Sequence, residues 1–211
     1  MLVETSKSAL RLLFACVALC LFLVVSRNAR AEESIIRHPG DHPTYGVELE
    51  PHLDFAFFLP TAGSTGVGLG GRATIPVVKN GFVPSINNSV GVGFGLDWLH
   101  YNACYYYSTF LYNACDNLNS FWFPVVMQWN FFLATHWSVF GEPGLSIVYQ
   151  NFGNYYCQAS NGVGVVCPAG PNRVVVEPVI FFGGRYHFSE SAALVLRIGW
   201  PYASFGVSFM L

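Results

Sequence analysis

The feature that most constrains this chain is an alternation of apolar and polar residues with a period of two. In the stretch VELEPHLDFAFFL (47–59), the odd-numbered positions are apolar and the first even-numbered positions are Glu48, Glu50, His52 and Asp54. Successive side chains of a β-strand point to opposite faces. The stretch is therefore predicted to be a strand with one apolar face and one charged face.

The same alternation recurs in seven further stretches. They are residues 67–78, 90–101, 121–134, 137–150, 173–188, 192–200 and 202–211. A strand of a soluble protein usually has about 5–6 residues. Most of these eight stretches are longer and match the length of about 9–11 residues with which a tilted strand crosses a bilayer. An even number of antiparallel strands can close into a ring without a free edge, as lipid requires. The sequence thus predicts an all-β fold, an eight-stranded antiparallel up-and-down transmembrane β-barrel over residues 46–211.

The polarity of the two faces decides between a membrane barrel and a soluble one. The polar face is small and rich in glycine, whereas the apolar face is continuous and aromatic. Hydrophobic residues make up 53% of the chain and charged residues only 10%, against about 25% charged in soluble domains. Water would not tolerate so large an apolar surface. Aromatic residues also gather near the expected strand ends, where membrane barrels carry aromatic girdles: Trp98, Trp129, Trp137, Tyr149, Tyr186 and Trp200.

The first 31 residues have the pattern of a secretory signal peptide. Lys7 and Arg11 are basic, residues 12–25 are an apolar run, and Ala29 and Ala31 form a cleavage site of the A-x-A type. The apolar run is short for a membrane helix, although an uncleaved anchor is the alternative. We expect residues 32–45 to be a periplasmic segment that precedes the barrel.

The lengths of the connections predict how the barrel is oriented. In outer-membrane barrels the short turns are periplasmic and the long loops extracellular. Short turns are expected at 135–136 and 189–190, and long loops at 102–120 and 151–172. Two connections depart from this rule: the longish expected turn at 79–88 and the very short outer connection at Pro201.

With these features the chain resembles the small eight-stranded outer-membrane β-barrel proteins of Gram-negative bacteria. In that family the last strand ends the chain and is recognised by the barrel-assembly machinery, and the final stretch YASFGVSFML (202–211) matches it. The matching residues are Phe205, Val207, Phe209 and Leu211, although the family usually ends in Phe or Trp. The resemblance implies the outer membrane as location, with outer-membrane lipid and the assembly machinery as partners.

Most of the charge is expected on the inner face of the barrel. The predicted interior residues are Glu48, Glu50, His52, Asp54, Arg72, Asp97, Glu142, Glu177, Arg185 and Arg197. Charges in a narrow barrel are costly unless they are paired. We interpret them as a structural network in which the arginines neutralise the acids. Because acids outnumber arginines, a narrow cation-preferring channel or a proton-coupled site is the alternative.

The sequence does not predict catalysis, a cofactor or a metal site. His100 lies near the outer end of its strand, but no His-x-Ser or Gly-x-Ser-x-Gly element accompanies it. A lipid A-modifying enzyme remains the alternative function that the family resemblance allows. His38, Asp41 and His42 precede the barrel in a segment that contains two prolines, where a solvated linker is expected rather than a metal centre.

Nucleic acid is excluded as a partner by charge. Removal of the signal peptide leaves eleven acidic and six basic residues, a net charge near −5, so there is no basic patch. The runs GVGLGG and GVGFG alternate within expected strands instead of preceding a helix that would cradle phosphate. We interpret their glycines as small residues that relieve crowding inside the barrel.

Four cysteines remain after export, and an even number in an exported chain favours disulfides. The tetrad Tyr-Asn-Ala-Cys occurs twice within 101–115. Cys104 and Cys115 lie in one expected long loop, and Cys157 and Cys167 in the other. We expect one bridge within each loop; pairing between the loops is the alternative. The first bridge would staple an aromatic tip that forms a surface for a partner, made of Tyr105, Tyr106, Tyr107, Phe110 and Tyr112.

Peptide mapping under non-reducing conditions tests this connectivity. We expect one peptide pair that contains Cys104 and Cys115 and another that contains Cys157 and Cys167. Each loop closure stabilises the folded chain by about 2–3 kcal/mol in the chain-entropy account. A peptide that joins Cys104 to Cys157 or Cys167 would overturn the assignment.

Overall fold

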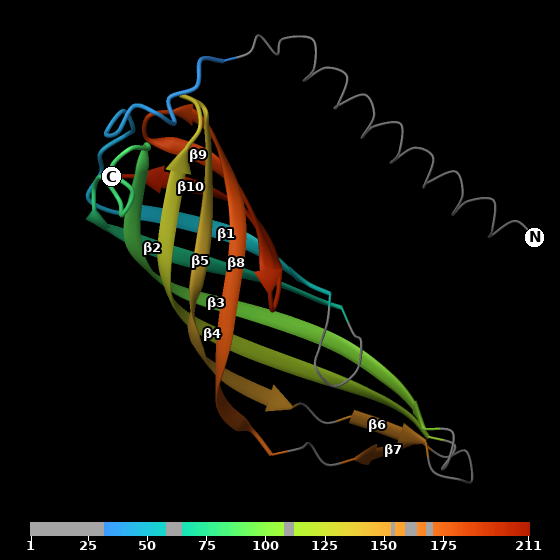
Figure 1. Ribbon diagram of the computed structural model, residues 1–211. Helices are drawn as coiled ribbons and strands as arrows, with labels where there is room; N and C mark the ends of the chain where they lie inside the picture. Colours follow the sequence, from blue (N-terminus) through green and yellow to red (C-terminus); the bar gives the residue numbers. More distant parts are fainter. Residues whose placement is uncertain (1–31, 58–64, 108–111, 153–154, 159–163, 168–170) are drawn as a thin grey trace, which may run out of the picture. The chain divides into compact units, whose positions relative to one another are not determined.

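The computed structural model describes residues 32–57, 65–107, 112–152, 155–158, 164–167 and 171–211 (Figure 1). Of residues 102–107, 112–117, 155–158 and 164–167, only the backbone is described. The chain divides into two units, Met1–Glu33 and Ser34–Leu211, and all described strands belong to the second. The expected signal peptide lies outside the described residues and stays a prediction. Within the described part of the chain, no helix is long and apolar enough to cross a membrane.

Eight strands pair into a closed antiparallel ring. They are β1 (Glu48–Ala56), β2 (Gly66–Val78), β3 (Asn88–Tyr107), β4 (Tyr112–Phe132), β5 (Trp137–Phe152), β8 (Arg173–Ser189), β9 (Ala192–Trp200) and β10 (Ala203–Met210). Each strand pairs with its neighbours in this order, and β1 pairs with β10, which closes the ring. The predicted eight-stranded antiparallel barrel is confirmed.

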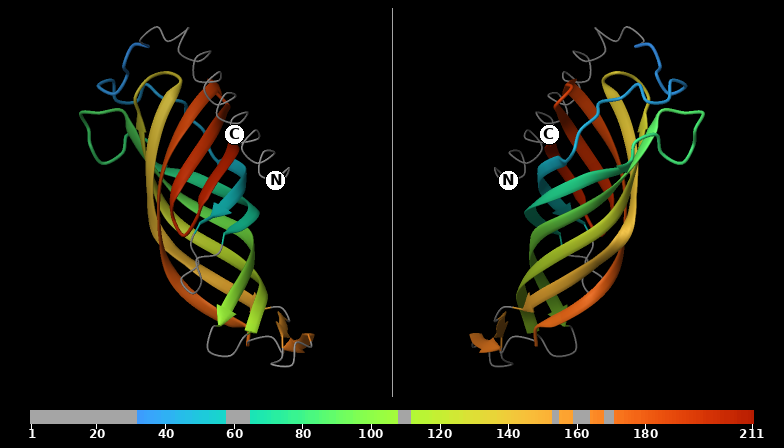
Figure 2. Two further views of the ribbon diagram at one scale, coloured as in Figure 1. Left: turned by 90° about the vertical axis from the view of Figure 1, so that its right-hand side faces the viewer. Right: turned by 90° about the vertical axis from the view of Figure 1, so that its left-hand side faces the viewer.

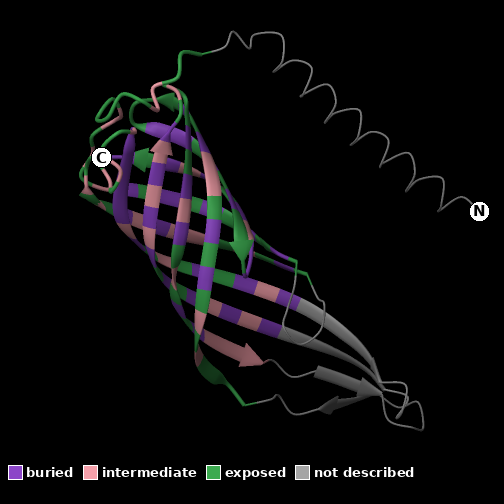
Figure 3. Ribbon diagram, viewed as in Figure 1, coloured by how far each residue is buried: buried purple, intermediate pink, exposed green. Residues whose placement is uncertain are grey.

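The alternation in the sequence becomes an alternation of burial (Figure 3). All nine residues of β1 alternate strictly between buried and exposed, beginning with the buried Glu48. The exposed face is apolar: Leu53 and Phe182 expose 53% and 64% of their surface. The buried face carries the acids and arginines. This is the reverse of a soluble barrel, and it suits a ring whose outside is in contact with lipid.

Two predicted loops are in part strands, which corrects the sequence interpretation. Residues 102–107 continue β3 and residues 112–120 belong to β4, so the two strands pair up to Tyr107 and Tyr112. In the second loop lie two short strands, β6 (Tyr155–Gln158) and β7 (Gly164–Cys167), and β6 pairs with β4. Tyrosines favour strands, and an antiparallel pair continues for as long as both chains offer extended partners. Figure 2 shows the β3–β4 hairpin reaching well past β1, β2, β9 and β10.

The segment before the barrel lies against the end that carries the short turns. Most of its residues are exposed, as expected of a solvated linker, but its backbone is hydrogen-bonded to the barrel. The Ile35 N–H donates to the carbonyl of Leu133 (3.0 Å), and the Asn87 N–H donates to the carbonyl of Ile36 (2.6 Å). The His42 ring stacks on Phe132, with centroids 4.5 Å apart. Polar backbone groups of the connecting loops need partners, and this segment supplies them.

A charge on the outer face tests the membrane orientation of the barrel. Leu145 lies near the middle of β5 and is 58% exposed. Leu145→Arg should lower the free energy of unfolding by about 2–4 kcal/mol, because an arginine near the bilayer midplane is poorly solvated. Urea unfolding of protein folded into lipid vesicles measures this.

The matched control is Thr135→Arg in the exposed turn between β4 and β5, where the same side chain should cost about 0–1 kcal/mol. Equal losses for the two variants would contradict a lipid-facing outer surface.

Candidate functional site inside the barrel

The interior of the barrel is the candidate site, because it gathers nearly all the predicted charged residues. Nine of the ten are at most 5% exposed: Glu48, Glu50, His52, Asp54, Arg72, Asp97, Glu142, Arg185 and Arg197. The tenth, Glu177, is only half-buried. It lies opposite Ser146 toward the end with the long hairpins. The interior charges are arranged in three layers along the barrel axis.

The first layer lies near the short turns and is built on Arg185. Its Nε is 3.0 Å from Oε1 of Glu48, and its Nη1 donates to Oδ1 of Asn130 (2.7 Å). The guanidinium also lies over the ring of Phe140, 4.2 Å from the centroid. The Tyr45 hydroxyl donates to Glu48 (3.3 Å). Burial, together with the negative charge of Glu48, raises the pKa of Tyr45 well above its ordinary value.

The middle layer is built on Arg197. Its two terminal nitrogens bind both oxygens of Glu50 (2.6 and 2.9 Å), and its Nε and Nη2 bind Glu142 (2.9 and 3.2 Å). Nη1 also donates to the Ser204 hydroxyl (3.0 Å), so all five N–H donors of this guanidinium have acceptors. Glu142 further accepts from Arg72 Nη1 (2.5 Å) and from the Gln128 amide (2.7 Å).

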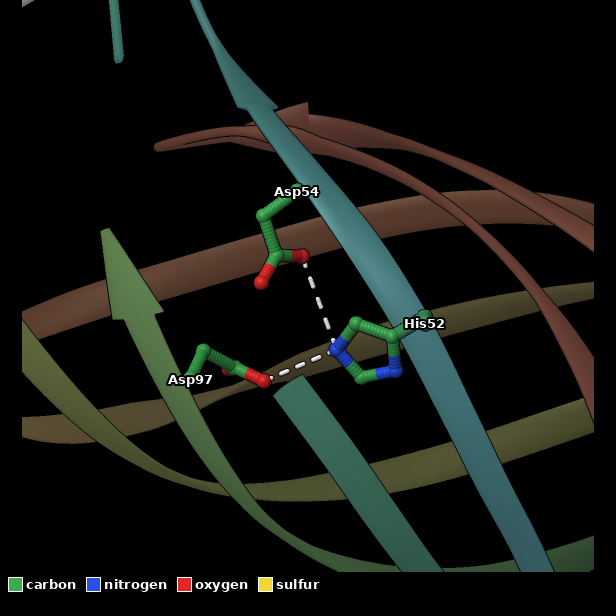
Figure 4. A group of neighbouring side chains, drawn as sticks. All are labelled: His52, Asp54 and Asp97. Carbon is green, nitrogen blue, oxygen red and sulfur yellow. Dashed lines mark hydrogen bonds and ion pairs between the residues drawn. The ribbon is translucent and has the colours of Figure 1, made fainter. Parts of the chain in front are cut away.

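The third layer is acidic and centres on His52 (Figure 4). Its Nε2 is 2.8 Å from Oδ1 of Asp97 and 3.5 Å from Oδ1 of Asp54. Its Nδ1 is 3.2 Å from the backbone carbonyl of Glu50. The Tyr202 hydroxyl donates to the second oxygen of Asp97. Neither oxygen of Asp54 accepts a hydrogen bond from the described residues.

An apolar cluster fills the barrel beyond the third layer. Its largest members are Tyr101, Trp122, Phe181 and Tyr202, none more than 6% exposed. With the charged layers, this cluster fills the described interior with side chains. The filled interior disfavours a narrow cation-preferring channel, because ions cross a membrane through water-filled or open coordinating paths.

The remaining predicted residues lie either on the outer face of the barrel or at positions whose side chains are not described. His100 is partly buried and shares the Asn119 side-chain oxygen with Trp98 (3.1 and 3.0 Å). Phe205, Phe209 and Leu211 expose 48%, 45% and 66% of their surface, and Val207 is half-buried. Their recognition by the assembly machinery stays a prediction.

The predicted loop surface can be placed only in part. Phe110 lies outside the described residues. The other members are described by backbone alone, on paired strands: Tyr105, Tyr106, Tyr107 and Tyr112. Of the cysteines, also described by backbone alone, Cys104 is directly opposite Cys115, Cys157 is opposite Val165, and Cys167 is opposite Tyr155.

Sequence reasoning missed four polar partners of the network: Gln128, Asn130, Tyr202 and Ser204. Gln128, Asn130 and Ser204 lie at even positions on the inward faces of β4 and β10, and Tyr202 directly precedes β10 with the same parity, so the alternation itself carried the signal. Neutral side chains were passed over because only charges were used to select interior residues.

The structure combines a closed ring of strands with an apolar outer face and a charged interior. The chain has the fold of a small outer-membrane β-barrel. The predicted location, the outer membrane of a Gram-negative bacterium, agrees with this fold.

No known protein family and no curated protein matches the sequence. Among solved structures, Neisserial surface protein A is similar with a TM-score of 0.49 and 10% identity, over 79% of this chain and 97% of that one. Ail, the attachment invasion locus protein of Yersinia pestis, has a TM-score of 0.43 and 8% identity, over 80% of this chain and 100% of that one. A complex of Ail with the heparin analogue sucrose octasulfate has a TM-score of 0.40 and 11% identity, over 78% and 99%. The barrel fold of this chain is established by its own strand pairing.

Removing the central arginine tests how far the barrel depends on its interior network. Arg197→Met should lower the free energy of unfolding by about 3–5 kcal/mol, because Glu50 and Glu142 lose their main counter-charge while they stay buried. Urea unfolding in lipid vesicles measures the loss. Arg173→Met, at an exposed position of β8, is the control and should change stability by no more than about 0.5 kcal/mol. Similar stability of the two variants would contradict a structural role for the network.

Proposed function

We propose that this protein is a non-enzymatic outer-membrane barrel that displays the β3–β4 and β6–β7 hairpins at the cell surface, for interaction with a partner or for envelope structure. One observation carries the proposal: a filled barrel bears strands far longer than a bilayer requires. Strands β3 and β4 have 20 and 21 residues, whereas about 9–11 suffice to cross.

The filled interior supports a scaffold role. Glu48, Glu50 and Glu142 are paired with arginines in the first two layers, and the outer part of the interior is packed with aromatic side chains. Binding residues are commonly carried on loops that a rigid framework positions. A barrel whose described interior holds buried side chains in successive layers provides such a framework, and it positions the projecting hairpins.

The composition of the β3–β4 hairpin supports a binding role. It carries the aromatic set Tyr105, Tyr106, Tyr107, Phe110 and Tyr112. Tyrosines give large contact areas at low cost in conformational entropy, which is why binding surfaces favour them. Pairing of the backbone up to Tyr107 and Tyr112 would present these residues on an ordered ribbon.

The strand register favours one of the two disulfides. Residues directly opposite in an antiparallel pair have Cα atoms about 4.5–5.5 Å apart, within the range of a disulfide. Cys104 and Cys115 are such a pair. Cys157 and Cys167 are offset by two positions, for which separations of about 7–8 Å are usual. The first bridge is therefore the better supported, and the second would need the β6–β7 hairpin to adjust.

The lipid A-modifying alternative would need a nucleophile or an acid beside His100. Its described contacts are to Asn119 and Trp98 on the outer face of the barrel, and neither group activates water or an acyl carbonyl. Mass spectrometry of lipid A from cells that express the chain, with His100→Ala as control, tests this alternative. A modification that depends on His100 would replace the display proposal.

A truncated hairpin tests the display function directly. Ala103 and Asp116 are cross-strand partners, so residues 104–115 can be replaced by an Asn-Gly turn that closes the shortened strands. Cells that display the wild-type chain should bind immobilised host glycoproteins and glycans at least tenfold better than cells with the truncated chain. Both chains should remain heat-modifiable on gels, which shows that each barrel is folded.

A variant with serine at all five aromatic positions separates the tip from the length of the hairpin. We expect it to bind as weakly as the truncated chain. Binding that survives truncation, or wild-type cells that bind no better than cells without the protein, would contradict a display role for this hairpin. Steady conductance of the purified protein in planar bilayers would favour a channel instead.

A further inference from the structure

The third layer of the interior is built differently from the other two. His52, Asp54 and Asp97 are buried, and one potential ligand atom of each lies within 4.8 Å of the others. Figure 4 shows the two carboxylates pointing toward the same nitrogen of the imidazole ring. In the other two layers each carboxylate is held by an arginine.

A glycine lets these groups meet across an intervening strand. His52 lies on β1 and Asp97 on β3, and both are in register with Gly70 of β2. A Cβ at Gly70 would lie 2.2 Å from Oδ1 of Asp97 and 2.7 Å from Nε2 of His52. Any other residue at this position would therefore fill the space in which the imidazole and the carboxylate approach each other.

The charges of the described interior do not balance. The buried carboxylates are five, those of Glu48, Glu50, Asp54, Asp97 and Glu142, and the buried arginines are three. Five negative and three positive charges leave −2 when His52 is neutral. Uncompensated charge in a dry interior is costly, and the excess is located in the third layer, since Glu48, Glu50 and Glu142 are held directly by Arg185 and Arg197.

The hydrogen bonds of this layer leave one ligand atom of each of the three residues directed at the others. In the tautomer whose Nδ1–H donates to the carbonyl of Glu50, a neutral His52 directs the lone pair of Nε2 toward two carboxylate oxygens. Both oxygens of Asp54, a fully buried residue, lack a hydrogen-bond donor among the described residues. Oδ2 of Asp97 accepts a hydrogen bond from the Tyr202 hydroxyl and lies 3.7 Å from Nη2 of Arg72. Oδ1 is therefore the oxygen that faces the cluster.

We propose that His52, Asp54 and Asp97 bind one divalent transition-metal ion inside the barrel. Ligand atoms about 2.1 Å from a common ion are ~3.0–3.4 Å apart at octahedral to tetrahedral angles, and the Nε2–Oδ1 distances here are 2.8 and 3.5 Å. One imidazole and two carboxylates suit zinc or manganese. The Glu50 carbonyl fixes the tautomer of His52, as outer-shell partners do for metal-bound histidines. A charge of +2 brings the interior to neutrality.

The position of the cluster predicts how the ion enters. It lies between the Arg197 layer and the apolar cluster of Tyr101, Trp122 and Phe181. The ion is therefore taken up while the barrel folds and is then exchanged slowly. A ligand that binds only the folded chain shifts the folding equilibrium, by about 100-fold when free metal is at 100 times the Kd.

Metal content of the purified full chain tests the proposal. The protein is refolded into detergent micelles with Zn²⁺, Mn²⁺ or Co²⁺, dialysed against EDTA and measured by mass spectrometry of the metal. The wild type should retain about one ion per chain until it is unfolded. Asp54→Asn, which keeps the shape of the side chain but removes its charge, should lose at least nine tenths of this metal.

Two further variants separate metal binding from folding and from the cysteines. Gly70→Ala leaves every ligand in place but fills the space beside Nε2, so it should also lose the metal. Glu48→Gln removes a carboxylate of the same interior outside the cluster and should retain the metal. Co²⁺ bound by nitrogen and oxygen ligands shows visible absorption without the near-ultraviolet thiolate bands that cysteine ligands would give.

The outcomes are distinct. The site is supported if the wild type and Glu48→Gln retain the metal while Asp54→Asn and Gly70→Ala lose it. A folded wild type that holds no more metal than Asp54→Asn overturns it, and the interior is then neutralised by protons on His52 and Asp54. Thiolate bands in the Co²⁺ spectrum of every variant would also overturn it in favour of binding by the cysteines.

Discussion

The double ion pair of Arg197 with Glu50 and Glu142 is the interaction on which the rest of the barrel depends. It joins β9 to β1 and β5, and Glu142 extends the contact to Arg72 on β2. Hydrogen bonds between neighbouring strands close the ring, whereas these ion pairs join strands that are not neighbours. Lipid outside the barrel can accept none of these charges, so the interior must satisfy them, and a partly satisfied network would be worse than an apolar core.

The network also explains why the interior is uneven along its length. Arg185 and Arg197 satisfy Glu48, Glu50 and Glu142, while Arg72 divides its charge between Glu142 and Asp97. Too little positive charge remains for the two aspartates beside His52. The imbalance therefore appears at the boundary between the charged layers and the aromatic cluster.

The two ends of the barrel differ in how their backbone groups find hydrogen-bond partners. At one end the short turns and the segment around His42 satisfy each other's backbone groups. At the other, β3 and β4 continue their pairing far beyond β1. The first end is thus closed by the segment before the barrel, and the second carries an extended two-stranded ribbon. The filled barrel between them supports the ribbon.

The sequence alone predicted the number of strands of the ring, their faces and the inward position of the charges, because alternation with a period of two is a local property of each strand. It did not determine where β3 and β4 end, since aromatic residues such as those at 105–107 suit a loop tip and a paired strand alike. It also placed Glu177 with the interior charges by parity alone, although this residue lies near the start of β8 and is only half-buried.

The pairing of each acid with its arginine depends on how the barrel closes and could not be predicted from the sequence. Glu50 and Arg197 are 147 residues apart, and their contact depends on the stagger of the strands around the ring and on the reach of the side chains. The meeting of His52 with Asp97 across Gly70 depends on the register of three strands. Sequence patterns specify the face on which a side chain lies, whereas barrel closure specifies its partner, because closure alone brings distant strands to opposite walls of one narrow interior.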